Sequence, residues 1–300
     1  AALKAMVRSS NINKKGSALY NEFGFVPSDV KKEAVSLTLE YAYDDWCIAR
    51  MAEELGHEDI AKEYYRRATN YVNVFDGSTS FFRGRNRDGS RTTPFDIFST
   101  GRDYTEATPW HYRFFAPHDV NGLIQLFGGR EQFIKALDDL FTVESDELTL
   151  DVSDVSGLKG QYAHGNEPSH NFAYLYSYAG QPWKTQELTR ELLDEMYDDT
   201  PDGIIGNEDC GQMSAWYVMS SLGFYSVCPG TGEYVLTTPL FDEAEMIMAN
   251  GKVLTIKANN PARNRYIKSV TLNGRPLTTT FITYAQLLEG GVLEFELSIK

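Results

Sequence analysis

The chain has 300 residues, 42% of them apolar and 13% aromatic, enough for one large domain or two ordinary ones with a sizeable core. A formal net charge of −14 argues against nucleic-acid binding, which needs a basic surface. No apolar run reaches about 18 residues, so no membrane span is expected. The three cysteines, Cys47, Cys210 and Cys228, contain no CxxC pair, and a Cys210–Cys228 bridge is left open.

The first third of the chain predicts helices. The opening AALKAMVRSS resembles the end of a helix without a start signal, so we expect a C-terminal piece of a longer protein. The lack of a signal peptide then says nothing about location. Ser28 is a plausible N-cap for a long helix that runs to Leu55 before Gly56, and a charged helix follows from Glu58 to Val74.

Acidic and aromatic residues are mixed in the middle of the long helix, in the segment LTLEYAYDDWCIA. Glu40 and Asp44 are four residues apart and therefore share one face of the helix. With Asp45 and Trp46 beside them, these acids could line a cleft. The alternative is a solvated stripe on the helix surface.

A long irregular stretch, residues 75–117, ends with Glu106, Trp110 and His111, and long loops inside compact domains are usually functional. Short helices are expected over Val120–Phe127 and Arg130–Phe141. A second loop then carries Gly165, Asn166 and Glu167 into an aromatic helix that Gly180 ends. The charged segment from Gln181 to Tyr197 predicts the helix that follows.

The stretch from Pro201 to Pro229 places Glu208 and Asp209 where a glycine-rich turn enters a helix. That helix is apolar on almost every side, which predicts that it is buried all round, and Gly223 is placed to end it. A helix N-terminus keeps carboxylates ionised, as a general base requires. The alternative is that both acids only cap the helix.

These segments alternate between apolar and charged helices, and acid-bearing loops enter the apolar helices. Inner helices ringed by outer helices form an α/α toroid, so the predicted fold is mainly α, an (α/α)6-toroid-type barrel portion. In such a ring the loops with Glu106, Glu167 and Glu208–Asp209 would converge on one mouth. After Pro229, β-branched residues alternate and Asn273-Gly274 signals a hairpin, which predicts a small C-terminal antiparallel β appendage. The predicted domains are residues 1–230, the barrel, and 231–300, the appendage.

Four separated motifs, TLEYAYDDWCIA, EATPWHY, HGNEPSH and GNEDCGQMSAWYVMSSLGFYSVCPG, strongly resemble glycoside hydrolase family 92 and stand in the right order. This family comprises exo-acting α-mannosidases that invert configuration and need calcium. The resemblance runs from about residue 3 to the C-terminus. It implies that an N-terminal β-sandwich domain, which completes the active site in the family, is missing from this chain.

The resemblance also implies residue roles. Glu106 matches the general acid and Asp209 the general base, with Glu208 or Asn207 in support. Glu167 matches a sugar and metal contact, although the sequence does not choose between Glu106 and Glu167 as the acid. The other expected sugar contacts are Asp44, Asp45, Trp46, Trp110 and His170.

The chain departs from the family pattern at several of these motifs. Ala107 and Thr108 replace the usual Gly-Asn, His111 replaces Gln, and Asn171-Phe172 replaces His-Ile. These departures bear on the linkage that is cleaved more than on the chemistry.

The implied cofactor is Ca²⁺, with Asn166, Glu167 and Asp209 as candidate oxygen ligands. There is no DxDxDG loop, so the ligands would come from separate loops. The histidines could instead suggest zinc, but they show no i, i+4 ligand spacing on one helix face. A GxSxG motif for a serine triad is absent.

The sequence therefore predicts a calcium-dependent inverting exo-α-mannosidase whose partner is a mannose-containing glycan. Another α/α-toroid glycosidase, or a non-catalytic carbohydrate-binding fragment, is the alternative. The family resemblance implies a periplasmic or secreted location.

Overall fold

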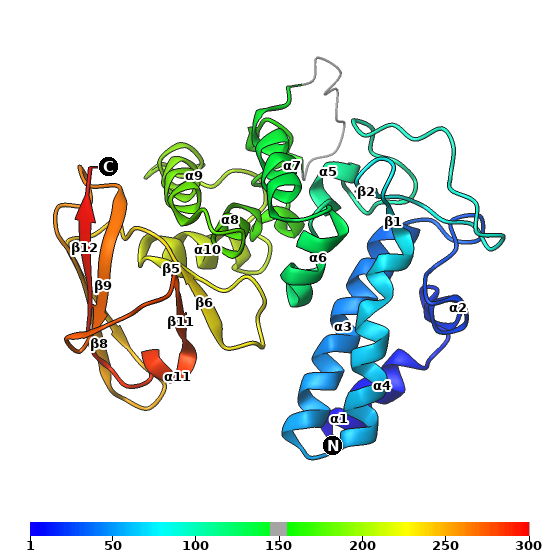
Figure 1. Cartoon of the computed structure of the whole chain (residues 1–300), viewed down its shortest axis with the longest axis horizontal. Helices are drawn as coiled ribbons and strands as arrows, with labels where there is room; N and C mark the ends of the chain where they lie inside the picture. Colours follow the sequence, from blue (N-terminus) through cyan, green and yellow to red (C-terminus); the bar gives the residue numbers. More distant parts are fainter. Residues whose placement is uncertain (145–154, 300) are drawn as a thin grey trace. The chain divides into compact units, whose positions relative to one another are not determined.

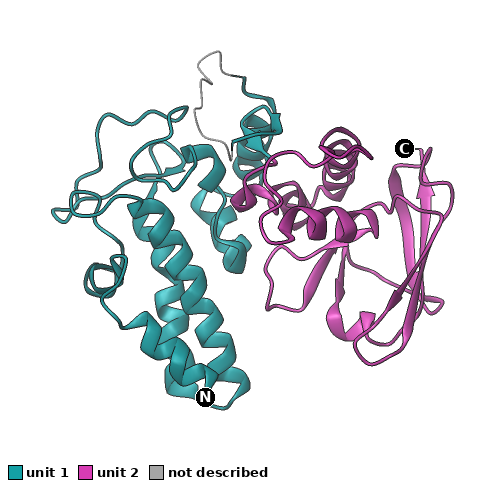
Figure 2. Ribbon diagram, turned by 180° about the vertical axis from the view of Figure 1, so that it is seen from behind, with its two compact units in different colours: residues 1–163 teal, residues 164–300 magenta. Residues whose placement is uncertain are grey.

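The computed structural model describes residues 1–144 and 155–299, and these form two compact units, residues 1–163 and 164–300 (Figures 1 and 2). The division lies between Ala163 and His164. It separates units by their internal contacts and does not test the predicted boundary after residue 230, which stays a prediction. Lys300, the last residue of the predicted appendage, lies outside the described residues.

The first unit is built around a helical hairpin of α3 and α4, which lie side by side (Figure 1). Its N-terminal elements are α1 (Ala2–Ser10), α2 (Ser17–Phe23), α3 (Ala34–Glu54), α4 (Glu58–Ala68) and the 3-10 turn η1 (Thr69–Val74). The small residues Ala42 and Ala49 of α3 are fully buried, as is Leu39. Gly56 adopts φ 72° and lets the chain reverse between the two helices.

The long helix begins at Ala34, so the predicted start at Ser28 was wrong. Its first-turn amides are satisfied by a distant loop: Val35 N and Ser36 N both donate to the Asp103 carbonyl, at 2.9 and 3.3 Å. Helix termini need such partners for their unpaired amides. Here the partner is far away in sequence, so local cap signals misplaced the boundary.

The remainder of the first unit is a short-element region with an aromatic core. Its elements are β1 (Phe75–Asp76), β2 (Phe81–Phe82), α5 (Pro109–Tyr112), η2 (Pro117–Asp119), α6 (Val120–Leu126), α7 (Arg130–Thr142), β3 (Leu158–Lys159) and β4 (Tyr162–Ala163). Phe114 stacks on Phe127 at 5.2 Å between ring centroids, and Phe133 meets both rings edge-on. The predicted irregular stretch and both short helices are confirmed within a residue or two.

The second unit opens with helical elements. They are η3 (Glu167–Ser169), η4 (Phe172–Tyr174), α8 (Leu175–Tyr178), α9 (Pro182–Glu195) and α10 (Gln212–Ser221). The prediction that α10 is buried all round was wrong. Met213 and Trp216 are buried, but Ala215 is exposed and Val218 is 51% exposed. Apolar composition marks a helix that can be covered, but no described segment of this unit packs over that face.

The second unit continues as two sheets, one of five strands in the order β10-β9-β12-β8-β7 and one of three in the order β11-β6-β5. The elements are β5 (Phe224–Tyr225), β6 (Glu233–Leu236), β7 (Glu243–Ile247), β8 (Val253–Ala258), β9 (Tyr266–Leu272), β10 (Arg275–Pro276), β11 (Phe281–Thr283), α11 (Tyr284–Leu287) and β12 (Gly291–Ser298). Asn273 and Gly274, with φ 53° and 75°, form the predicted hairpin turn.

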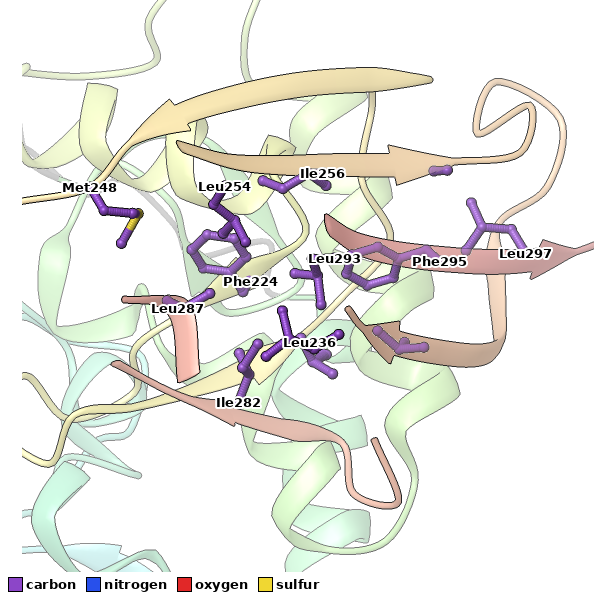
Figure 3. Packing of buried hydrophobic residues seen from close by; sticks show 13 residues of the cluster. Phe224, Leu236, Met248, Leu254, Ile256, Ile282, Leu287, Leu293, Phe295 and Leu297 are labelled. Atoms are coloured by element: carbon purple, nitrogen blue, oxygen red, sulfur yellow. The ribbon is translucent and has the colours of Figure 1, made fainter. Parts of the chain in front are cut away.

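One strand pair departs from the predicted antiparallel appendage. β12 pairs with β8 in parallel, with Leu293 opposite Ile256. Leu254, Leu293 and Phe295 then share a core with Phe224, which precedes the appendage (Figure 3). Period-two alternation reports which face of a strand is buried and carries no information on strand direction.

The fold is thus mainly helical with a β region at its C-terminal end, whereas a closed helical toroid stays a prediction. Within the described ranges, no helix has both the length and the apolar character that a membrane crossing would require. All three cysteines are free thiols, so the bridge left open between Cys210 and Cys228 is not formed.

Candidate active site

In the first unit, Glu106 lies exposed on a loop that the start of α3 holds in place. Glu33 N donates to the Arg102 carbonyl at 2.6 Å, and Thr105 N donates to Ser36 Oγ at 2.9 Å. Glu106 itself adopts φ 50°, a left-handed conformation that costs a non-glycine residue energy. The backbone on the N-terminal side of Glu106 is therefore anchored while its side chain is presented outward.

Asp103 forms the buried base of the same loop. Its carboxylate accepts a hydrogen bond from Thr92 Oγ1 at 3.2 Å, and burial raises its pKa above the ordinary range. Gly84 lies against it so closely that a Cβ there would be 2.2 Å from Asp103 Oδ2 and 2.5 Å from Ser28 Oγ. Nothing in the sequence pattern marked this close approach.

The helix α5 that follows Glu106 is part of the core. Trp110 is 3% exposed, lies edge-on to Phe81 at 4.9 Å, and has the Arg113 guanidinium over its ring at 4.7 Å. His111 is 1% exposed, and its Nδ1 accepts a hydrogen bond from Thr108 N at 3.2 Å. Burial lowers the pKa of His111 to about 4, so it is neutral near pH 7.

The acids of α3 separate into two kinds. Glu40 and Asp44 are both exposed, and Glu40 Oε1 accepts a hydrogen bond from the Tyr112 hydroxyl at 3.0 Å. Asp45 is 1% exposed and forms an ion pair with Arg67 at 2.9 Å. The Tyr20 hydroxyl also donates to it, at 3.0 Å.

Asp44 and Asp45 border a pocket of about 510 Å³ in the first unit, together with Lys14, Lys15 and Tyr41. Trp46 is not among its lining residues. Its ring stacks on Tyr43, with 6.0 Å between ring centroids. The structure therefore places Asp44 and Asp45 at one pocket, whereas Trp46 and Trp110 are buried and do not line it.

In the second unit, the loop with Asn166 and Glu167 makes a 3-10 turn. Ser169 N donates to the Asn166 carbonyl at 3.1 Å and His170 N to the Glu167 carbonyl at 3.0 Å. Asn166 is buried and Glu167 half-buried. His170, a predicted sugar contact, is buried, and both of its ring nitrogens have partners within this unit, His164 and Gln212.

Glu208 and Asp209 differ sharply although they are adjacent. The Glu208 carboxylate caps α10, because it accepts hydrogen bonds from Gly211 N and from Ser214 N, the latter at 3.1 Å. Hydrogen bonding from the Ser214 side chain, and then from these two amides, lowers the pKa of Glu208. Asp209 is exposed, and its carboxylate has no hydrogen-bond or ion-pair partner among residues 1–144 and 155–299. The capping alternative is thus true of Glu208 and not of Asp209.

The turn that carries Asp209 is strained. Asp209, Cys210 and Gly211 have φ of 48°, 59° and 94°, so non-glycine residues hold two of three successive left-handed positions. Left-handed non-glycine residues cost about 1–3 kcal/mol each and are concentrated at active sites and ligand clamps. Asp209 and Glu106, the predicted base and one of the two candidate acids, share this feature.

The candidate metal ligands Asn166, Glu167 and Asp209 all belong to the second unit and offer only oxygen donors, the donor type that suits a hard cation. In the part of the chain that the structure describes, no three His, Cys, Asp or Glu side chains gather into a metal-binding group. A cation on these residues would therefore need amide, backbone or water oxygens to complete its coordination.

Each unit thus presents an exposed carboxylate, and paired carboxyl groups are what glycoside hydrolases use as acid and base. The chain belongs to that class by family: the glycosyl hydrolase family 92 catalytic domain matches residues 1–299.

Solved structures of the family are closely similar over the whole chain. One is the α-mannosidase BT3965 of Bacteroides thetaiotaomicron in complex with mannoimidazole, with 40% sequence identity, a TM-score of 0.95, and coverage of 100% of this chain and 40% of that chain. Another is the inverting mannosidase BT2199 of the same species, with 38% identity, a TM-score of 0.90, and coverage of 100% and 43%.

A curated relative, an uncharacterized secreted glycosidase of Arthroderma benhamiae, is 29% identical in an alignment 303 positions long, which covers 92% of this chain and 37% of the relative. The chain thus spans well under half the length of the relatives it matches.

Proposed function

We propose that the protein carrying this chain is an inverting exo-α-mannosidase that depends on calcium and removes terminal α-linked mannose from glycans. The solved relatives support the sugar, since they are an α-mannosidase and an inverting mannosidase at about 40% identity. The observation that carries the proposal is the contrast at the α10 entrance, where one carboxylate caps the helix and its neighbour is presented to solvent.

That contrast supports Asp209 as the base. Inverting hydrolysis needs a carboxylate that activates water and an acid that protonates the leaving oxygen, roughly 6.5–9.5 Å apart. Each Glu208 oxygen accepts a backbone amide, so this carboxylate is already engaged in holding the turn. Asp209 is exposed, and its carboxylate has no hydrogen-bond or ion-pair partner among the described residues. Glu208 therefore holds the turn and Asp209 takes the proton from water.

Glu106 is the proposed general acid, with Glu167 as the alternative donor. The anchored backbone before Glu106 suits a group that must meet one glycosidic oxygen repeatedly. Asp44, at the border of the first unit's pocket, is the proposed sugar contact on α3, whereas Asp45 is already bound to Arg67.

Asn166, Glu167 and Asp209 would hold the calcium ion. When bound, the ion would chelate the cis O2 and O3 of mannose and stabilise the distorted ring of the transition state. We further propose that residues 1–230 belong to an (α/α)6 barrel and residues 231–300 to a β appendage. An N-terminal β-sandwich domain would complete the active site. The protein would be exported.

The test is hydrolysis of an aryl α-mannoside by the full-length protein, with NMR detection of the anomer first released. We expect β-mannose as the first product, loss of activity in chelator, and recovery with calcium. Asp209→Asn should lower kcat by about 10²–10⁴-fold, the usual contribution of a general base. The matched control Glu208→Gln should lower the unfolding midpoint and keep kcat within tenfold.

Three results would refute the proposal. Equal losses of kcat in Asp209→Asn and Glu208→Gln would remove the distinction between base and cap. Activity on aryl α-glucosides but not α-mannosides would favour another toroid glycosidase, and no glycosidase activity at all would favour a carbohydrate-binding fragment.

A further inference from the structure

A buried hydrogen-bond network in the second unit joins the loop of Glu167 to the turn of Asp209. His170 is its centre and is 2% exposed. Its Nε2 lies 2.8 Å from the His164 carbonyl oxygen, and its Nδ1 lies 3.0 Å from Gln212 Nε2. The first contact closes the loop that contains Glu167, and the second connects that loop to the first residue of α10.

These contacts determine the tautomer of His170. A carbonyl oxygen only accepts hydrogen bonds, so Nε2 must carry the proton that it donates to His164 O. Nδ1 then holds a lone pair and accepts from the Gln212 amide. The ring is therefore neutral, in agreement with burial that lowers its pKa to about 4.

Helix α10 holds His170 at two points. Gln212 and Trp216 are four residues apart and lie on one face of the helix. Trp216 Nε1 donates to the His170 carbonyl at 2.9 Å, while Gln212 Nε2 donates to Nδ1 and also to the Tyr225 hydroxyl at 3.1 Å. Both amide protons of Gln212 are thus used, so its orientation is fixed.

The network ends at the two carboxylate-bearing segments. Gln212 N donates to the Asp209 carbonyl at 3.2 Å, and His170 N donates to the Glu167 carbonyl at 3.0 Å. Each carboxylate residue is therefore one short turn away from a residue of the His170–Gln212 pair. The left-handed turn at Asp209 needs such anchoring, because strained backbone persists only where its surroundings determine it.

We propose that His170 is a positioning residue rather than a sugar ligand. As a neutral Nε2–H imidazole, it fixes the Asp209 turn relative to the Glu167 loop through Gln212. Neither ring nitrogen is left for a substrate hydroxyl. This inference rests on the proposed function for the role of Asp209, but the network itself can be tested without any activity.

The variants separate the two hydrogen bonds of the ring. His170→Gln can keep a donor near the Nε2 position but loses the Nδ1 acceptor, and Gln212→Met removes the tether with little change in side-chain length. The matched control is Tyr174→Phe, which removes a buried hydrogen bond to Ser220 Oγ of the same helix, 2.5 Å long, and leaves the His170 contacts intact.

In the full-length protein we expect His170→Gln and Gln212→Met to lower kcat at least tenfold with KM within about threefold, whereas Tyr174→Phe keeps kcat within twofold. Hydrogen exchange at residues 208–212 should become at least tenfold faster in Gln212→Met and remain unchanged in Tyr174→Phe. NMR of ¹⁵N-histidine-labelled protein should show the Nε2–H tautomer for His170.

Two results would overturn the proposal whether or not the protein is active. One is an Nδ1–H tautomer of His170. The other is a hydrogen-exchange rate at residues 208–212 that is the same in Gln212→Met and in the wild type. A kcat of Gln212→Met within twofold of the wild type would also overturn it. If the protein hydrolyses no α-mannoside, the proposed function fails, and the tautomer and the exchange rates still decide for or against the tether.

Discussion

His111 gives the sharpest link between a single buried group and the pH dependence of stability. It is 1% exposed, and burial lowers its pKa from an ordinary 6.5 to about 4. In the unfolded chain the imidazole binds a proton below about pH 6.5, whereas in the folded protein it does so only below about pH 4. Between these values the unfolded state holds more protons, so stability falls as pH falls.

The magnitude follows from the two pKa values. With about 6.5 unfolded and about 4 folded, lowering the pH from 7 to 5 costs roughly 2 kcal/mol of folding free energy from this residue alone. His111→Gln removes the titration while retaining an amide that can accept from Thr108 N. The variant should therefore lose about 2 kcal/mol less than the wild type over the same pH interval.

The assay is urea unfolding of wild type and His111→Gln at pH 7 and pH 5, followed by tryptophan fluorescence. The difference between the two pH-dependent losses cancels any destabilisation that the substitution causes at both pH values. Equal losses in the two proteins would show that His111 is protonated or solvated in the folded state, and would refute the argument from burial.

Two further substitutions test packing and charge. In Gly84→Ala the new Cβ would be 2.2 Å from Asp103 Oδ2, so we expect a lower unfolding midpoint and a lower kcat. The control is Gly77→Ala, which has open space around the new Cβ and should change neither quantity. Thermal unfolding and mannoside hydrolysis measure the two quantities. Asp45→Asn breaks a buried ion pair and should cost about 3–5 kcal/mol in urea unfolding, whereas Lys135→Gln breaks an exposed pair and should cost almost nothing. An equal cost for the two charge variants would contradict the burial of Asp45.

The sequence predicted elements whose signals are local. The helices that begin at Val120 and Arg130 end within a residue of their predicted bounds, because periodicity and glycine signals act within a few residues. The helix predicted over Glu58–Val74 begins where expected, but it is α-helical only to Ala68 and continues to Val74 as a 3-10 turn. The start of α3 was misplaced because the partner that caps it is the Asp103 carbonyl. The parallel β12–β8 pair was missed because strand direction is set by topology and not by alternation.

Single residues of the site were harder to predict than motifs. Asp44 and Asp45 are adjacent in one motif, yet one is exposed and the other bonds to Arg67. Successive residues of a helix point about 100° apart, so Asp44 can face the surface while Asp45 faces the interior. Gly84 gave no signal either, since its importance comes from the Asp103 carboxylate packed against its Cα.

Glu208 and Asp209 show that an acid which caps a helix and an acid which serves as a general base can stand side by side at one helix entrance. A left-handed turn at Asp209 is unfavourable by itself, and a capping carboxylate one residue earlier offsets part of that cost by binding the amides of Gly211 and Ser214. The cap therefore makes the strained, exposed placement of its neighbour possible. Two successive acids can therefore divide the work, one holding the turn through its backbone contacts and the other presenting an exposed carboxylate.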